Sequence, residues 1–501
     1  MIAREKVLVA NRGEVAIRVI RACREMGIAS VALHSEPDRM APHVRLADEA
    51  VGIEGGLPSE TYLDHAKILA AAKAVGATML HPGYGFLSED PSFREACDAA
   101  GLRFIGPTAA QMRQLSHKLP ARAAMAAAGV PVVPGSKGEV ASPEEALAVA
   151  ERVGWPVMLK ASAGGGGKGM RRVDRPEDLQ AAFEASAREA RSAFGCPSLF
   201  VEKHIASPRH VEVQFVADGR GGVVHLGERV CSVQRRHQKV VEEAPEPGND
   251  PHRKARYAAT VRAVAGLGYE GIGTVEYLVD PAGASFFLEV NTRLQVEHSV
   301  TEAVFGVDLV QAQLGLAMGQ PMPWQQQDLS PRGAAIECRV CAEDPYNGFV
   351  ASPGRLFRYR PPAGPFVRVD DGVEEGGEVC SFYDTLIAKV TCWGRTRPEA
   401  IARMQRALSE FEIGGVRHNL PFLQHVLASR EFADGTYDTG LVTRIGPLPA
   451  ADLVTVEEVA AAAATRTLLD PGSGSFPAPT VEPGPSGWRR TAAAAPAWRR
   501  G

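Results

Sequence analysis

The stretch EVNTRLQVEH, residues 289–298, decides the fold of this chain. It completes the second of two segments, residues 274–280 and 285–290, that are rich in β-branched and aromatic residues. The four residues between the segments, PAGA, are typical of a turn, so the pattern predicts a β-hairpin. The polar residues that follow, residues 293–298, then lie in a loop at the end of the hairpin.

Three oxygen-bearing side chains are expected to meet on this hairpin. Side chains alternate across a strand, so Glu289 and Asn291 face the same way, and Glu276 on the partner strand can point at the same spot. Two carboxylates and an amide oxygen suit a hard cation such as Mg²⁺, which leaves its other positions to water and phosphate. An exposed, charged hairpin end is the alternative interpretation.

The composition excludes several classes of protein. The chain has 501 residues, 45% of them hydrophobic, and its 55 Lys and Arg nearly balance its 59 Asp and Glu. This length predicts roughly two to four domains, and the balanced charge gives no sign of nucleic-acid binding. No apolar run approaches the ~20 residues of a membrane span, and no signal-peptide core follows Met1, so we expect a cytoplasmic protein. Its eight cysteines are then reduced thiols.

Two cysteines, Cys338 and Cys341, form a lone CxxC. A zinc site would need a second pair or nearby histidine ligands, and neither follows. Two residues of one strand are the better interpretation.

The first 105 residues alternate short strands with helices. The predicted elements are, in order, a strand at 6–10, a helix at 15–23, a strand at 30–34, a helix at 62–75 and a strand at 77–80. Such alternation predicts βαβ units on a Rossmann-like parallel sheet. The run HPGYGFLSE, residues 81–89, comes directly after a strand, where open α/β sheets place ligands. An Ala-rich stretch, residues 106–131, then predicts a helical linker.

The next unit, residues 132–205, contains a glycine-rich loop. A strand is followed by AGGGGKG, residues 163–169. A P-loop needs Ser or Thr after its Gly-Lys, but Gly169 follows Lys168. The dinucleotide motif needs a helix, whereas residues 170–173 continue as a strand. A hairpin loop whose bare amides close over phosphates is the third interpretation, and a flexible loop without a ligand is the alternative.

Two polar segments lie in the unit formed by residues 206–330. His210, Glu212 and Gln214 share one face of a strand, which is more typical of a solvated sheet face. The run QRRHQKVVEE, residues 234–243, is by default a solvated charge run. An anion site is the competing interpretation, because the run precedes the metal hairpin in a chain that already contains a phosphate-closing loop.

The remainder consists of a compact unit and a tail. Residues 331–447 contain predicted strands at 334–340 and 382–390 and an amphipathic helix at 398–411. Residues 448–501 begin with a predicted helix at 454–466, and the Pro-, Gly- and Ala-rich residues 470–501 are expected to be disordered. This tail uses Trp-Arg-Arg twice, which fits a docking peptide or a random basic tail equally well.

Taken in order, these features resemble the ATP-grasp fold and, more closely, the biotin carboxylase family. The runs that carry the resemblance are residues 10–14, 81–89, 160–170, 208–213, 234–245, 289–298 and 337–345. The resemblance covers about residues 6–440. It implies an α/β protein with a Rossmann-like N-terminal domain (1–105), a linker (106–131), a mobile glycine-rich lid (132–205), an ATP-grasp core with the metal and bicarbonate site (206–330), an α+β C-terminal domain (331–447) and a tail (448–501).

The resemblance also implies a role for individual residues. ATP would be contacted by Lys118, Lys160, Gly164, Gly165, Gly166, Gly167, Glu202, Lys203, Ile205, His210, Gln234, His237, Leu278, Glu276 and Glu289. Two Mg²⁺ or Mn²⁺ ions would be held by Glu276, Glu289 and Asn291. Bicarbonate would be bound by Lys239, Arg293, Gln295, Val296 and Glu297, and biotin by Tyr84, Arg339 and Asp384. A homodimer would form around Arg21, Glu25 and Arg368.

The residue types suit the reaction that the resemblance implies, in which bicarbonate attacks the γ-phosphate of ATP to give carboxyphosphate and ADP. The catalytic residues would be Lys239, Arg293, Glu297 and Arg339. Arg293 offers a two-point grip on an anion, and Glu297 is placed to act as the base on bicarbonate. Arg339 would stabilise the enolate-like oxygen of biotin, and a closed lid would exclude water.

Some positions depart from the family pattern. Ala163 stands where a further glycine is common, and Leu115-Ser116-His117 precede Lys118 where Met-Gly-Asp is usual. The chain also lacks the Ala/Val-Met-Lys-Met acceptor motif, so biotin is expected on a separate carrier protein, unless this chain is a fragment of a longer one. A carboxyltransferase subunit is the other expected partner, with no nucleic acid and no membrane.

Four functions remain in competition. The first is the biotin carboxylase subunit of an acyl-CoA carboxylase, for acetyl- or propionyl-CoA. The second is the same subunit of a two-subunit pyruvate or other 2-oxoacid carboxylase. An ATP-grasp ligase that joins a carboxylate to an amine and a non-catalytic carboxylase scaffold are the more distant alternatives.

Overall fold

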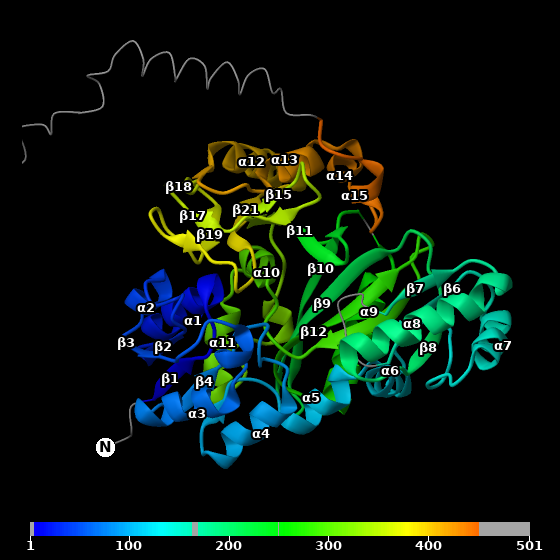
Figure 1. Ribbon diagram of the computed structural model, residues 1–501, viewed down its shortest axis with the longest axis horizontal. Helices are drawn as coiled ribbons and strands as arrows, with labels where there is room; N and C mark the ends of the chain where they lie inside the picture. Colours follow the sequence, from blue (N-terminus) through cyan, green and yellow to red (C-terminus); the bar gives the residue numbers. More distant parts are fainter. Residues whose placement is uncertain (1–4, 163–168, 249, 450–501) are drawn as a thin grey trace, which may run out of the picture. The chain divides into compact units, whose positions relative to one another are not determined.

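The computed structural model of the chain describes residues 5–162, 169–248 and 250–449 (Figure 1). The described residues up to Pro447 belong to one compact unit. The predicted helix at 454–466, the tail with its Trp-Arg-Arg repeats and the glycines at 164–167 lie outside the described residues. Among the described residues, no helix is long and apolar enough to cross a membrane.

The N-terminal region is the predicted parallel sheet. Its strands lie in the order β3-β2-β1-β4-β5, namely Glu49–Gly52, Ala29–His34, Lys6–Val9, Met79–His81 and Arg103–Phe104. The helices are α1 (Gly13–Glu25), α2 (Pro42–Leu46), α3 (His65–Ala74) and α4 (Pro91–Ala99). Helix α1 ends at Glu25, and Gly27, two residues further on, has φ +69°, which glycine adopts without a Cβ penalty.

The linker contains two helices, α5 (Ala109–Ser116) and α6 (Lys118–Ala127). His117 between them is extended, with φ −94° and ψ 126°. Pro120 explains the break, because a continuous helix would need its missing N–H, whereas a new start at Lys118 puts Pro120 in a first turn.

The lid region is a three-stranded sheet covered by helix α8 (Leu179–Phe194) (Figure 1). Its order is β7-β6-β8, namely Arg171–Val173, Val157–Ala161 and Leu199–Lys203, and helix α7 (Pro143–Val153) precedes it. Strands β6 and β7 are antiparallel, so the glycine-rich loop joins a hairpin, as expected. This excludes the strand-to-helix turn of a dinucleotide motif.

An antiparallel sheet of eight strands forms the rest of the core. Its order is β13 (Ser285–Asn291), β12 (Glu270–Val279), β9 (Arg209–Asp218), β10 (Val223–Arg235), β11 (Gln238–Ala244), β14 (Ala334–Cys341), β21 (Leu386–Gly394) and β19 (Val367–Asp371). The β11–β14 pairing carries the sheet across residue 330, where the sequence predicts a domain boundary. The domain boundaries remain a prediction.

Shorter elements surround this sheet. Small strands are β15 (Glu343–Asp344), β16 (Val350–Ala351), β17 (Gly354–Arg355), β18 (Arg358–Arg360), β20 (Glu378–Val379) and β22 (Glu412–Gly414). The helices are α9 (Arg253–Gly266), α10 (His298–Phe305), α11 (Leu309–Ala317), α12 (Arg397–Glu410), α13 (Leu420–Ala428), α14 (Arg430–Asp434) and α15 (Leu441–Arg444).

Two local predictions can be compared with the structure directly. The strand expected from residue 382 begins only at Leu386, because Asp384 accepts the Leu386 N–H in a turn. All eight cysteines lie in described residues and are free, and Cys338 and Cys341 are buried in β14, as the strand interpretation predicts.

Candidate active site

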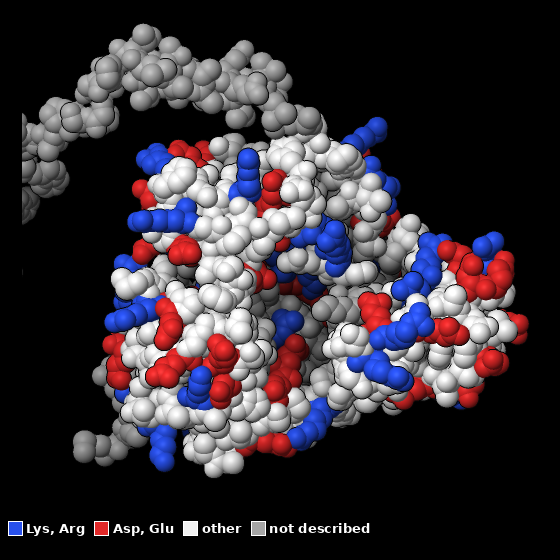
Figure 2. Space-filling view, viewed as in Figure 1, with Lys and Arg blue, Asp and Glu red and all other residues white. Residues whose placement is uncertain are grey.

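A cavity of about 620 Å³ lies between the lid sheet and the eight-stranded sheet. Figure 2 shows a hollow in the surface of the molecule, with basic and acidic side chains together in it. The residues singled out from the sequence that line it are Lys118, Lys160, Glu202, Lys203, Ile205, His210, Gln234, His237, Lys239, Glu276, Leu278, Glu289, Asn291, Arg293, Gln295, Val296 and Arg339. The fold therefore gathers residues that are up to 221 positions apart (118 to 339) around one space.

The predicted hairpin places its three oxygen-bearing side chains as expected. Glu276 on β12 is directly opposite Glu289 on β13, and Asn291 Nδ2 donates to Glu276 Oε1 at 2.7 Å. Glu276 and Asn291 are buried, so an exposed hairpin end is wrong.

Two facing carboxylates make this spot suited to a divalent cation. Burial raises the pKa of Glu289, and the negative charge of Glu276 raises it further, against a smaller opposite effect of Lys118. A bound divalent cation would relieve that repulsion. The donor set of two carboxylates and an amide oxygen fits Mg²⁺ or Mn²⁺.

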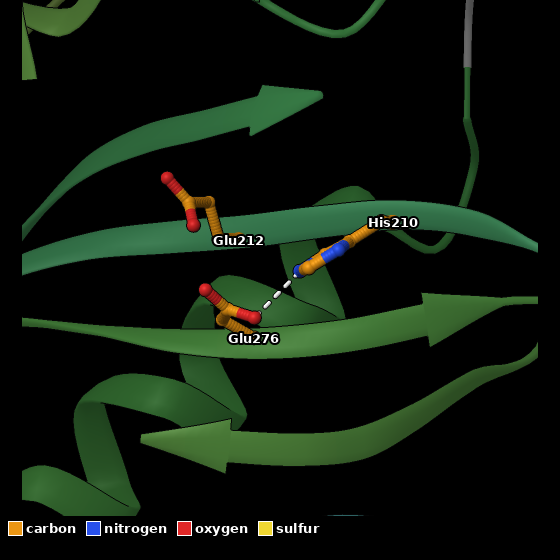
Figure 3. A group of neighbouring side chains, drawn as sticks. All are labelled: His210, Glu212 and Glu276. Carbon is orange, nitrogen blue, oxygen red and sulfur yellow. Dashed lines mark ion pairs between the residues drawn. The ribbon is translucent and has the colours of Figure 1, made fainter. Parts of the chain in front are cut away.

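One face of strand β9 is buried, although the alternation of polar and apolar residues predicted that it faces solvent. His210, Glu212 and Gln214 point into the protein from β9. His210 Nε2 lies 2.6 Å from Glu276 Oε2, and Figure 3 shows the two side chains pointing toward one another from neighbouring strands. Arg229 of β10 donates to Glu212 and Gln214. The solvated-face prediction is wrong because helix α10 packs over this face, where its Thr301 accepts from Arg229.

The centre of the site is Lys239, which β11 places among three carboxylates. Its Nζ lies 2.7 Å from Glu212, 2.8 Å from Glu276 and 2.6 Å from Glu297. Burial lowers the pKa of Lys239, but Cys231 and these carboxylates raise it well above its usual range, so it stays an ammonium. The default interpretation of a solvated charge run is thus wrong at Lys239, and the site is built around a cation whose side chain is only 12% exposed.

Glu297 is held between two cations. Its carboxylate is fully buried and lies 2.6 Å from Lys239 Nζ and 2.9 Å from Arg339 Nη2. Burial raises the pKa of Glu297, but Lys239, Arg339 and Arg229 lower it well below its usual range. The carboxylate is therefore ionised at neutral pH and can accept a proton once an entering anion shares its cations.

Arg293 is oriented by a residue that the sequence analysis did not assign. Glu89 Oε2 accepts from Arg293 Nε at 2.8 Å, and Glu89 Oε1 accepts from the Thr292 N–H at 3.0 Å. Glu89 is the last residue of the run 81–89, which follows β4. Its position beyond the end of a strand is the sequence feature that could have indicated its role. Arg293 Nη1 also donates to Gln295 Oε1 at 3.2 Å.

Further cations line the lid side of the cavity. Lys160 Nζ lies 2.5 Å from Glu202, which also accepts from Arg122 at 3.2 Å. Arg122 is a second residue that the sequence analysis missed, one helical turn after Lys118 on α6. Burial lowers the pKa of Lys118, and the positive charge of Lys160 lowers it further.

Two predicted biotin contacts lie outside the cavity lining formed by the described residues. The Tyr84 hydroxyl donates to Glu14, and Asp384 accepts from a backbone N–H in its turn. Among the predicted dimer residues, Arg368 pairs with Glu302 at 2.6 Å and with Asp370 at 2.9 Å. The roles given to all these residues remain predictions.

Comparison with known families covers most of the chain. The model of the biotin carboxylase N-terminal domain matches residues 3–112, and the model of its C-terminal domain matches residues 337–444. The model of the carbamoyl-phosphate synthase L chain ATP-binding domain matches residues 117–325.

Relatives support the same family. The biotin carboxylase of Nostoc sp. is 47% identical over 87% of this chain and 98% of its own length. A pyruvate carboxylase subunit of Methanothermobacter thermautotrophicus is 48% identical over 87% of this chain and 89% of its own length.

Solved structures agree with these relatives. The biotin carboxylase domain dimer of Hydrogenobacter thermophilus 2-oxoglutarate carboxylase, in complex with MgADP, ADP and bicarbonate, matches with a TM-score of 0.85 and 44% identity. That match covers 88% of this chain and 97% of the other. A Campylobacter jejuni biotin carboxylase complex matches with a TM-score of 0.85 and 41% identity over 88% of this chain and 98% of its own. This chain therefore belongs to the biotin carboxylase family of ATP-dependent ligases.

Proposed function

We propose that the chain uses ATP and bicarbonate to carboxylate N1′ of a biotin that a separate carrier protein presents. ATP, bicarbonate and biotin give ADP, phosphate and carboxybiotin, with carboxyphosphate as the intermediate. One observation carries the proposal. Lys239 joins the carboxylate of Glu297 to that of Glu276, so a base and a metal ligand share one cation at the cavity wall.

ATP would lie along the lid side of the cavity. Lys118 and Lys160 would face its phosphates, and Glu202 and Lys203 would line the adenine and ribose end. Glu276, Glu289 and Asn291 would hold Mg²⁺, which supplies neutralisation of phosphate oxygens in such transfers. MgADP in the Hydrogenobacter thermophilus structure supports this assignment.

Bicarbonate would enter between Lys239 and Arg293. These cations bind its negative charge, and Arg293 can donate from two N–H groups once Glu89 has oriented it. Glu297 takes the hydroxyl proton of bicarbonate as an oxygen of bicarbonate attacks the γ-phosphate and ADP leaves. Closure of the glycine-rich loop would keep water from the labile product.

Biotin would then approach Arg339. Its guanidinium lies at the cavity wall and would stabilise negative charge on the ureido oxygen as N1′ loses its proton. The phosphate that leaves carboxyphosphate would take this proton, and N1′ would then bond to the carbon dioxide released with it. Glu242 lies 2.5 Å from the same Nη2 that contacts Glu297, so two buried carboxylates fix the guanidinium in place.

The acceptor of the carboxyl group is proposed from the sequence. We favour an acyl-CoA carboxylase, and the propionyl-CoA carboxylase alpha chain of Ruegeria pomeroyi is 45% identical. The pyruvate carboxylase relative with 48% identity keeps a 2-oxoacid carboxylase as the second candidate. A biotin carrier, a homodimer, a cytoplasmic location and a carboxyltransferase partner are parts of the same proposal. The dimer in the Hydrogenobacter thermophilus structure supports the homodimer.

Two matched arginine variants test the proposal. Arg339 and Arg397 are 13% and 14% exposed, and each is ion-paired with a buried glutamate. Arg397 lies outside the cavity lining of the described residues. With Mg²⁺, ATP and bicarbonate, Arg339→Ala should abolish the stimulation of ADP release by free biotin, and Arg397→Ala should retain it. Equal stimulation in both variants would overturn the proposed role of Arg339, and no stimulation of the wild type would overturn the function.

A further inference from the structure

A row of three charged residues crosses the C-terminal end of the large sheet. Arg339 on β14 is directly opposite Lys389 on β21, and Lys389 is directly opposite Asp370 on β19. Directly paired residues of neighbouring strands project from the same face of a sheet. This face packs on helix α10, which follows the loop at residues 293–297. The row therefore faces the loop that carries Glu297.

Lys389 is fully buried and makes one short contact to that loop. Its Nζ donates to the carbonyl oxygen of Val296 at 2.6 Å. Glu14 lies 3.4 Å from the same ammonium and Asp370 lies 4.0 Å from it. Burial lowers the pKa of Lys389, but Glu14, Glu337 and Asp370 raise it by more, so the group is a cation.

Two neighbouring cations thus hold two consecutive residues of the loop. Lys389 holds the backbone of Val296, and Arg339 holds the carboxylate of Glu297 at 2.9 Å. The carbonyl of Val296 and the N–H of Glu297 belong to one planar peptide unit. Fixing that carbonyl therefore fixes the backbone from which the Glu297 side chain leaves.

Lys389 also reaches the N-terminal region. Glu14 on α1, its ion-pair partner, accepts from the Tyr84 hydroxyl. Tyr84 belongs to the segment after β4 that also contains Glu89, which orients Arg293. One buried ammonium therefore links the backbone beside the base to the segment that positions the anion-binding arginine.

We propose that Lys389 is a positioning residue for carboxylation, which holds the Val296–Glu297 peptide so that Glu297 faces the entering bicarbonate. The inference rests on the proposed function. Lys389 contacts no reacting atom; it acts through the peptide that it holds, so its loss changes the use of bicarbonate more than the binding of ATP.

Lys389→Met is the test variant, and Arg256→Met is its control. Arg256 is also buried among three carboxylates, Glu228, Glu246 and Asp250, but lies outside the cavity lining of the described residues. We expect Lys389→Met to lower kcat/KM for bicarbonate roughly 10- to 100-fold, the scale for a group displaced by about an ångström, with KM for ATP unchanged. Arg256→Met should lower thermal stability without this selective loss of kcat/KM for bicarbonate.

A second readout needs no turnover. Amide hydrogen exchange over residues 293–298 of the ligand-free chain should be faster in Lys389→Met and unchanged in Arg256→Met. If Lys389→Met does not fold, the same comparison is made with Lys389→Arg, which keeps the charge but not the compact ammonium. Unchanged exchange, or a rise in KM for ATP as large as the loss of kcat/KM for bicarbonate, would overturn the role of Lys389. A wild type without biotin-stimulated turnover would instead overturn the proposed function.

Discussion

The carboxylate of Glu297 and the ammonium of Lys239 lie 2.6 Å apart, and Lys239 lines the cavity. In the ligand-free chain, the proposed base and the proposed anion-binding cation therefore neutralise each other. An anion that enters competes for Lys239, which weakens the hold on Glu297 and raises its basicity. We expect the base to become effective only when its substrate is bound.

Removal of this carboxylate should abolish chemistry and spare nucleotide binding. Glu297→Gln keeps the shape of the side chain but cannot take the bicarbonate proton, so kcat should fall by about 10²- to 10⁴-fold. KM for ATP should stay within a factor of about two. Steady-state ADP release checks this, with Glu410→Gln in the exposed Arg406 pair as the control. A Glu297→Gln chain with normal kcat would show that another group is the base.

Acid should destabilise the chain through the same pairs. The pKa values of Glu276 and Glu297 are well below their usual range, because nearby cations outweigh burial. Their unfolded values are near 4.3, so their stabilisation is present above about pH 4.3 and is lost as pH falls toward the folded values. Urea unfolding midpoints between pH 6 and pH 3 should fall less steeply in Glu297→Gln. Identical slopes in the variant and the wild type would contradict this.

The two facing carboxylates predict opposite effects with and without metal. Without Mg²⁺, Glu289→Gln should be about 0.2–1 kcal/mol more stable, since like charges directly opposite each other in a sheet repel. With Mg²⁺, thermal unfolding of the wild type should shift upward, and the variant should shift much less. Chelation with EDTA should remove the shift and the ADP release together. An equal Mg²⁺ shift in both chains would place the metal elsewhere.

Glu89 should matter for bicarbonate and not for ATP. Glu89→Gln removes the charge that holds Arg293, a contact of a kind worth about 1.5–3 kcal/mol, so KM for bicarbonate should rise roughly 10- to 100-fold. Glu95→Gln is the matched control, because Glu95 pairs with an arginine of α5 at an exposed position. If the two variants behave alike, Glu89 does not orient Arg293 for the reaction.

ATP binding should weaken at alkaline pH as Lys118 loses its charge. Burial and Lys160 lower its pKa, so its charge is lost as pH rises through a value below its usual range. KM for ATP should therefore increase at alkaline pH, and Lys118→Arg should remove this increase because guanidinium does not titrate there. If KM for ATP still increases at alkaline pH in Lys118→Arg, another group is responsible for the increase.

The sequence predicted local structure well and the environment of charged residues poorly. The hairpin around Glu276 and Glu289, the strand with Lys160 and the N-terminal parallel sheet follow from patterns within about ten residues, and the structure contains them. The burial of Glu212 depends on helix α10, whose Thr301 lies 72 positions beyond Arg229. Lys239 lies on β11, which pairs with β14 about 100 positions further along the chain. No local pattern encodes such coverage, so both residues were assigned to solvent by default.

The same reason explains the residues that were missed. Glu89 meets Arg293 across 204 positions, and Lys389 meets Val296 across 93. The break at His117 was locally encoded, because Pro120 cannot continue a helix in the middle of a linker. The resemblance supplied the residue roles, which periodicity alone would not have given.

Transfer of labelled carbon from bicarbonate to free biotin tests the central claim most directly. The purified chain, with ATP and Mg²⁺, should form acid-labile labelled carboxybiotin together with one ADP per carboxyl group. Glu297→Gln and Arg339→Ala should form none above background. Label that reaches an added amine instead, or ADP release that biotin does not change, would contradict the account.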